Sequence, residues 1–261
     1  MIIAFICIVL IFNTMETISI HRPKIVVIGS CNTDMVVKAN RLPVPGETIL
    51  GGTFYMNPGG KGANQAIAAA RLGAEVTFIS KIGYDLFGLQ ALEIYRSEKI
   101  NTEYIFTDQK SPSGVALISV DSFGENSIIV APGASRSLSI EDINKAEEKI
   151  KEADIILMQL EIPIDTVEYA ATIACKYGKK VILNPAPASS LSNSFLMNVH
   201  TILPNRIEAE MLSGIKVMNI ESAHRAAQAI GEKGIENVVI TLGKDGACLL
   251  YTSDAADDLI G

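Results

Sequence analysis

The sequence has 261 residues, of which 48% are hydrophobic, so the chain can bury the core of one or two domains. Its 22 basic and 29 acidic residues give a formal net charge of −7, which argues against nucleic acid or a membrane as a partner but leaves room for a local phosphate site. The four cysteines lie far apart and form no CxxC pair, which argues against a disulfide framework or a structural zinc site and favours a reducing cytoplasm.

The chain opens with an apolar run at residues 2–12 that is typical of the hydrophobic part of an export signal. No Lys or Arg precedes this run, no small-x-small cleavage site follows it, and it is shorter than the roughly 20 residues that cross a bilayer. A second methionine, Met15, stands just before the first polar stretch. We therefore expect residues 1–14 to be a non-native extension, with a genuine export signal as the alternative.

Short β-branched runs alternate with longer runs of helical spacing along most of the remaining chain. In chain order, the pattern predicts strand 24–29, helix 62–72, strand 76–80, helix 86–97, helix 140–153, strand 155–159, helix 164–177, strand 181–184, strand 201–203, helix 206–213, helix 222–233 and strand 237–241. Such alternation predicts an α/β fold with three layers, in which helices cover both faces of a mostly parallel sheet.

Two stretches break this alternation and predict a small, separate β-sheet. Residues of about 35–57 carry short extended runs divided by Pro43 and Pro45, and residues 114–130 are typical of a hairpin with its turn at 121–126. A small sheet of this kind could form a lid over the carboxyl ends of the main strands, where open α/β sheets bind ligands.

The sharpest candidate site is the segment 57–65, NPGGKGANQ. Its three glycines let the backbone come close to a ligand. Lys61 adds a cation, and Asn64 can both donate and accept hydrogen bonds, as the hydroxyls of a sugar require. The segment is no Walker loop, because GxxxxGK[ST] is absent. An ordinary glycine-rich turn before a helix is the alternative.

Polar residues also follow the ends of two predicted strands. Asn32 and Asp34 come after the first strand, and the two oxygens of Asp34 could bind neighbouring sugar hydroxyls. Both residues also favour an Asx turn, which is the alternative. Glu161 follows strand 155–159 and either binds ligand or caps the next helix.

A second group of candidates suits a nucleotide. Asn205 and Glu208 stand three residues apart at a predicted helix start, so they share a face. A carboxylate there could organise a hydrated Mg²⁺ beside phosphates, although a capping box gives the same pattern and both can hold together. Thr241, Gly243 and Gly246 form a turn after the last predicted strand that could take a phosphate or ribose near its backbone.

These segments, in this order, resemble the PfkB-type (ribokinase-like) carbohydrate kinase family over about residues 24–247; they are GSCNTD, NPGGKGANQ, QLEIP, NPAPA, LPNRIEAE and ITLGKDGA. The resemblance implies a Rossmann-like α/β domain, a β-sheet lid that often forms a homodimer contact, and transfer of the ATP γ-phosphate to the 5-hydroxyl of D-ribose, giving D-ribose 5-phosphate. It also implies Mg²⁺ and K⁺ as cofactors. A family member that acts on fructose, a deoxysugar or a nucleoside is the alternative.

The resemblance also assigns roles by position in this sequence. It implies sugar binding by Asn32, Asp34, Gly60, Lys61, Asn64 and Glu161. It implies ATP binding by Asn205, Thr241, Gly243 and Gly246, and a role near Mg²⁺ for Glu208.

One family motif has no counterpart in this sequence. A Gly-Ala-Gly-Asp loop, whose Asp is the family's catalytic base, is expected downstream, yet Asp254, Asp257 and Asp258 follow no such turn. The segments expected to hold K⁺ and most of the adenine are missing as well. We therefore expect little or no kinase activity from this chain, and a non-catalytic sugar-binding fragment is the second hypothesis.

The last residues also depart from the family pattern. Residues 248–257, CLLYTSDAAD, resemble one translated frame of a sequencing adapter. We expect the authentic sequence to end near Ala247 and residues 248–261 to be an artefactual tail, with a natural truncated paralogue as the alternative.

Overall fold

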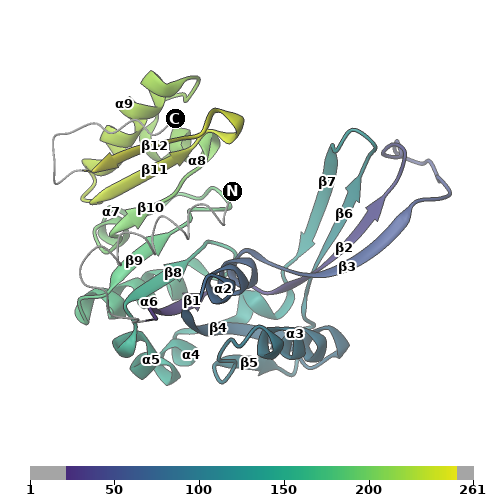
Figure 1. Ribbon diagram of the computed structural model, residues 1–261, viewed down its shortest axis with the longest axis horizontal. Coiled ribbons are helices and arrows are strands. Elements are labelled where there is room, and N and C mark those ends of the chain that lie inside the picture. The colour runs from purple at the N-terminus through teal and green to yellow at the C-terminus, as the bar shows by residue number, and fades with distance from the viewer. Residues whose placement is uncertain (1–21, 252–261) are drawn as a thin grey trace.

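The computed structural model describes residues 22–251, so the expected extension at 1–14 and residues 252–261 of the expected tail lie outside the described residues. Figure 1 shows a large sheet with helices on both faces and a small sheet that projects away from it. Within the described residues, no helix is both long and apolar enough to cross a membrane.

The large sheet has eight strands in the spatial order β12-β11-β10-β9-β8-β1-β4-β5. All neighbours run parallel except β11 and β12, which are antiparallel. The strands are β1 Lys24–Ile28, β4 Glu75–Gly83, β5 Ile105–Asp108, β8 Ile155–Met158, β9 Lys180–Leu183, β10 Thr201–Ile202, β11 Asn237–Thr241 and β12 Ala247–Tyr251.

The helices form the two outer layers of the fold. They are α2 Lys61–Arg71, α3 Leu86–Ser97, α4 Ile140–Lys145, α5 Glu147–Glu152, α6 Ile164–Lys176, α7 Asn193–Leu196, α8 Arg206–Ser213 and α9 Ile220–Gly231, with 3-10 turns η1 Gly133–Ser137 and η2 Gly243–Asp245. Side chains of β1 alternate between two buried clusters: Val26 and Ile28 pack with α4 to α9, whereas Ile25 and Val27 pack with α2 and α3. The predicted three-layer α/β fold is confirmed.

The predicted small sheet is also present, in the order β3-β2-β6-β7. Its strands are β2 Asn32–Lys38, β3 Thr53–Gly59, β6 Gly114–Val120 and β7 Asn126–Ala131. The expected hairpin turn lies between β6 and β7, where Asp121 Oδ1 accepts hydrogen bonds from the N–H groups of Phe123 and Glu125. The Asx turn given as the alternative for Asn32 and Asp34 is wrong. Both residues lie in β2 itself, because they pair with β3 and β6 instead of forming a local turn.

Several element boundaries differ from the predicted ones. The helix predicted at 140–153 is two helices, because at Ala146 the chain tightens and its N–H donates to Ile143 O at 3.0 Å, three residues back. The helix predicted from 222 begins at Ile220, because Asn219 caps it and forms a capping box with Ser222. β5 and α7, of four residues each, were not predicted.

The first residues of the expected tail belong to a strand. Cys248 to Tyr251 continue β12, which pairs with β11 from Thr241↔Ala247 to Asn237↔Tyr251. The artefactual origin of residues 248–261 stays a prediction.

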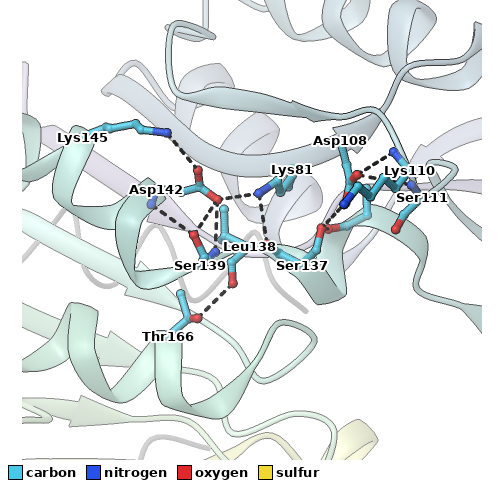
Figure 2. Close-up of polar contacts among 11 residues, drawn as sticks. Lys81, Asp108, Lys110, Ser111, Ser137, Leu138, Ser139, Asp142, Lys145 and Thr166 are labelled. Carbon is cyan, nitrogen blue, oxygen red and sulfur yellow. Dashed lines mark hydrogen bonds and ion pairs between the residues drawn. The ribbon is translucent and has the colours of Figure 1, made fainter.

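A buried ion pair fixes the chain where it returns from the small sheet to the large one (Figure 2). Lys81 Nζ on β4 donates to Asp142 Oδ2 at 2.7 Å and to Ser137 O at 3.0 Å. The Asp142 side chain is only 6% exposed. Burial alone would raise the pKa of Asp142, but the hydrogen bonds from Lys81 and Ser139 outweigh it and hold that pKa below its usual value. The pair therefore stabilises the fold at neutral pH, and this stabilisation is lost as the pH falls into the acid range.

Replacing Asp142 with Ala should lower the free energy of unfolding by about 3 kcal/mol, because it leaves the Lys81 charge buried without its partner. Lys145→Ala is the matched control, since Lys145 reaches the same carboxylate at 3.6 Å from a 64% exposed position and should change stability by less than about 0.5 kcal/mol. Urea unfolding measures both variants. Equal changes in the free energy of unfolding would show that the buried pair stabilises the fold no more than the exposed one does.

Candidate functional site

The topology of the large sheet places the candidate site at the carboxyl ends of β1 and β8, a region called the crevice below. The strand order reverses at β1, because β4 lies on one side of it and β8 on the other. Open α/β sheets bind ligands at such a reversal. Ile28 pairs with Met158 at the end of the two strands, so Ser30 and Glu161 leave the sheet close together.

Glu161 is anchored in this crevice by two donors. Ser30 Oγ donates to Glu161 Oε2 at 2.5 Å, and the backbone N–H of Lys61 donates to the same oxygen at 2.9 Å. Lys61 is the first residue of α2, and Gly60 before it has no side chain with which to cap the helix. Glu161 thus supplies the missing cap and places its charge at the positive end of the helix dipole.

One of the two roles expected for Glu161 is wrong. The next helix, α6, starts after Pro163 and receives no side-chain cap. Glu161 instead caps α2, which lies 100 residues earlier in the chain.

Asp34 reaches the same crevice from the small sheet. Its carboxylate lies against Gly59 of β3, where an added Cβ would stand 1.9 Å from Asp34 Oδ1. Burial raises the pKa of Asp34, and the negative charge of Glu161 raises it further. Asn32, two residues earlier on β2, is buried, and its Oδ1 has no hydrogen-bond partner among the described residues. Two carboxylates therefore meet here, and the unpartnered amide oxygen belongs to a residue two positions before Asp34 on the same strand.

Two glycines bring the start of α2 against the end of β1. Gly60 has a φ of 88°, and an added Cβ would lie 2.9 Å from Ser30 O. A Cβ on Gly62 would lie 2.7 Å from the same oxygen. No side chain fits at either position. Asn64, in the first turn of α2, is exposed and is left able to contact a ligand.

The nucleotide candidates meet at the ends of β10 and β11. Asn205 N donates to Glu208 Oε2 at 2.8 Å, and Glu208 N donates to Asn205 Oδ1 at 2.9 Å, so the expected capping box is formed. Burial raises the pKa of Glu208, against the hydrogen bonds from Asn205 and the positive charge of Lys61. The effect of Lys61 on Glu208 links the starts of α2 and α8 electrostatically across the crevice.

The turn at 241–246 lies beside this helix start. Asn205 and Thr241 form a parallel bridge. Gly243 has a φ of 70° and Gly246 a φ of 87°, a region that side chains disfavour, so the turn depends on both glycines. Every nucleotide candidate thus lies in one group, separate from the sugar candidates but linked to them through Lys61.

Two residues that the sequence analysis passed over support these groups. Ser30 holds Glu161, which lies 131 residues away. Arg206 holds the turn at 241–246, because its Nη2 donates to Asp245 Oδ2 at 2.7 Å and to Leu242 O at 3.2 Å. A serine after a strand and an arginine in a first helical turn are ordinary, so no local spacing distinguishes them.

A cavity of about 400 Å³ adjoins the sugar candidates, because Asn32 is one of the residues that line it. It is lined by residues of the small sheet such as Met56 and of α3 such as Phe87, and neither Asp34 nor Glu161 lines it. The described residues also contain no group of three or more His, Cys, Asp or Glu that could hold a metal ion. The candidate site combines the carboxylates of Asp34 and Glu161 with the backbone N–H group of Lys61.

The coupling between the two carboxylates can be tested directly. Glu161→Gln keeps an oxygen for the α2 cap but removes the charge, so the pKa of Asp34 should fall, although not to its usual value because burial remains. An NMR titration that follows the Asp34 carboxyl carbon measures the change. Glu103→Gln, at an exposed position on another part of the surface, should leave that pKa unchanged. An equal response to both variants would contradict the shared site.

Comparisons with known proteins identify two sugar kinases that are similar to this chain in sequence. The chain is 46% identical over 225 residues to a ribokinase of Haemophilus influenzae, which covers 86% of this chain and 74% of that relative. It is 39% identical over 224 residues to a deoxyribokinase of Salmonella typhi, covering 85% of this chain and 73% of the relative.

Solved structures give the same result. The structure of Arabidopsis thaliana ribokinase complexed with ribose and ATP superposes with a TM-score of 0.81 at 30% identity, covering 92% of this chain and 78% of that one.

The model of the pfkB family carbohydrate kinases matches residues 22–256. The chain belongs to the pfkB family of carbohydrate kinases.

Proposed function

We propose that this protein is an ATP-dependent ribokinase, whose crevice binds D-ribose for phosphorylation at the 5-hydroxyl. The observation that carries the proposal is the meeting of Asp34 and Glu161 at the glycine-rich start of α2. The 46% identity to a ribokinase over most of the chain supports it. A deoxyribokinase at 39% identity makes 2-deoxy-D-ribose the main rival substrate.

The sugar roles follow from hydrogen-bonding capacity. Asp34 offers two acceptor oxygens, and Glu161 offers Oε1, since its Oε2 already accepts from Ser30 and Lys61. Asn32 and Asn64 bring amides that donate and accept, and Gly60 lets the backbone approach. A pentose, whose hydroxyls each donate and accept, matches this mixed set better than a purely anionic ligand would.

The nucleotide roles rest on the second group. Asn205 and the turn formed by Thr241, Gly243 and Gly246 would hold ATP, with the positive charge of Lys61 between the nucleotide and the sugar. Phosphoryl transfer depends mainly on such positioning and on electrostatic stabilisation. The protein's contribution is then to place the two substrates on either side of Lys61.

Glu208 suits a magnesium ion only through water. Its Oε2 accepts from Asn205 N, it is 6% exposed, and Mg²⁺ usually keeps several waters while using one or two carboxylates with the phosphates. When bound, Mg²⁺ would neutralise charge on the phosphates. K⁺ has no residue assigned to it in this chain, and no step is derived through it.

Calorimetry on the full chain tests the proposal. D-ribose should bind more tightly than 2-deoxy-D-ribose or D-fructose, and Asp34→Asn should weaken ribose binding about tenfold or more, because an amide replaces an acceptor of two hydroxyl bonds. Asp121→Asn, in the β6–β7 turn, is the matched control and should bind as the wild type does. Tighter binding of the deoxysugar would favour the rival substrate, and no sugar binding would overturn the proposal.

The same samples test the expected lack of turnover. No Gly-Ala-Gly-Asp turn occurs in the sequence, so no base is assigned for the ribose hydroxyl. Ribose-dependent ADP formation should stay near the uncatalysed background. A rate close to that of a full ribokinase would contradict this expectation.

We also propose that two copies pair through their small sheets. On the face opposite Asp34, cross-strand neighbours Met56, Met35, Leu117 and Ile129 form a continuous apolar row. Ile129 is 70% exposed and Leu117 is 54% exposed. Burying this row against its equivalent in a second copy would remove apolar surface from water, which favours association.

Leu117→Lys should convert the dimer to a monomer, because it places a charge in the centre of the apolar row. Sedimentation velocity measures the change. Leu50→Lys, at a 96% exposed position outside the row, is the matched control and should stay dimeric. A wild-type chain that sediments as a monomer would overturn the pairing.

A further inference from the structure

Ser30 occupies a buried position between three parts of the site. It is the second residue after β1 and is 1% exposed. Its hydroxyl donates to Glu161 Oε2, and its carbonyl oxygen accepts the N–H of Ala63 in the first turn of α2 at 2.9 Å. One residue therefore contacts both the carboxylate at the end of β8 and the helix that this carboxylate caps.

The hydroxyl saturates one oxygen of Glu161 and leaves the other available. Oε2 accepts from Ser30 Oγ and from Lys61 N, whereas Oε1 has no hydrogen bond among the described residues. Two donors on one oxygen fix the plane in which the second oxygen points. The Asp34 carboxylate receives no such donor among the described residues. The site therefore contains one carboxylate that hydrogen bonds orient, Glu161, and one that they do not, Asp34.

The end of β1 does not need the Ser30 hydroxyl to keep its place. Ser80, a fully buried residue of β4, already holds it, because Ser80 Oγ donates to Gly29 O at 2.7 Å and lies 3.3 Å from Cys31 Sγ. Ser30 Oγ has a different partner, the carboxylate itself. The two buried serines thus separate two tasks, holding the strand end and orienting the acid.

The charges around Glu161 explain why such a donor matters. Asp34 of β2 brings a second carboxylate close enough for the charge of Glu161 to raise its pKa. The backbone N–H of Lys61 and the hydroxyl of Ser30 both donate to Glu161. These two donors hold Glu161 in one orientation beside a carboxylate of like charge.

We infer that Ser30 is a positioning residue of the sugar site, which orients Glu161 so that Oε1 accepts a hydroxyl of the bound sugar. The inference rests on the proposed binding of D-ribose. It assigns a role to a residue that contacts no substrate and acts only through Glu161.

The test compares Ser30→Ala, Ser30→Thr and the matched control Ser80→Ala in the full chain. Calorimetry with D-ribose gives the affinity, and thermal unfolding gives the stability. Ser30→Ala should weaken ribose binding about tenfold, because Glu161 loses one of the two donors that orient it. Ser30→Thr keeps the hydroxyl and should restore most of the affinity.

Ser80→Ala should lower the unfolding temperature while the ribose affinity stays as in the wild type. The inference is overturned if Ser30→Ala binds ribose with unchanged affinity, or if Ser80→Ala loses the same affinity. A wild-type chain that does not bind ribose overturns the proposed function, and the role of Ser30 with it. If Ser30→Thr does not fold, the ribose affinities of Ser30→Ala and Ser80→Ala still decide.

Discussion

The hydrogen bond from the Lys61 N–H to Glu161 holds the site together. The start of α2 has unsatisfied N–H groups and a glycine where a capping side chain would stand. A carboxylate from another strand fills that position, and its charge complements the helix dipole. Because α2 must come this close, β1 and α2 meet backbone to backbone, with glycine at 60 and 62. The first two strands of the small sheet begin and end at this contact, since β2 starts after β1 and β3 leads into α2.

Charges from distant parts of the chain act on one another in the crevice. The negative charge of Glu161 raises the pKa of Asp34, and the positive charge of Lys61 opposes the burial that raises the pKa of Glu208. Lys61 is also the first residue of α2 and donates its N–H to Glu161. The same residue thus links the packing of the helix start to the electrostatics of the crevice.

The sequence predicted the layers, most helices and the small sheet, because periodicity and glycine positions report local structure and burial. It also identified the residues that the structure brings to the crevice, such as Asp34 and Glu161. It could not place Asn32 and Asp34 in a strand, because their partners on β3 and β6 lie far along the chain. The donors to Glu161 depend on pairing across 131 and 100 residues, which no window of sequence contains.

The small sheet contacts the rest of the protein chiefly at its base, through α2 and η1, while its outer strands project into solvent (Figure 1). The base of the small sheet and its projecting strands therefore tolerate substitutions differently. A substitution near Gly59 or Gly60 disturbs the contacts at the start of α2, whereas one near Phe54 or Ile129 changes only exposed surface. The projecting faces can thus vary in sequence while the residues around the start of α2 stay in place.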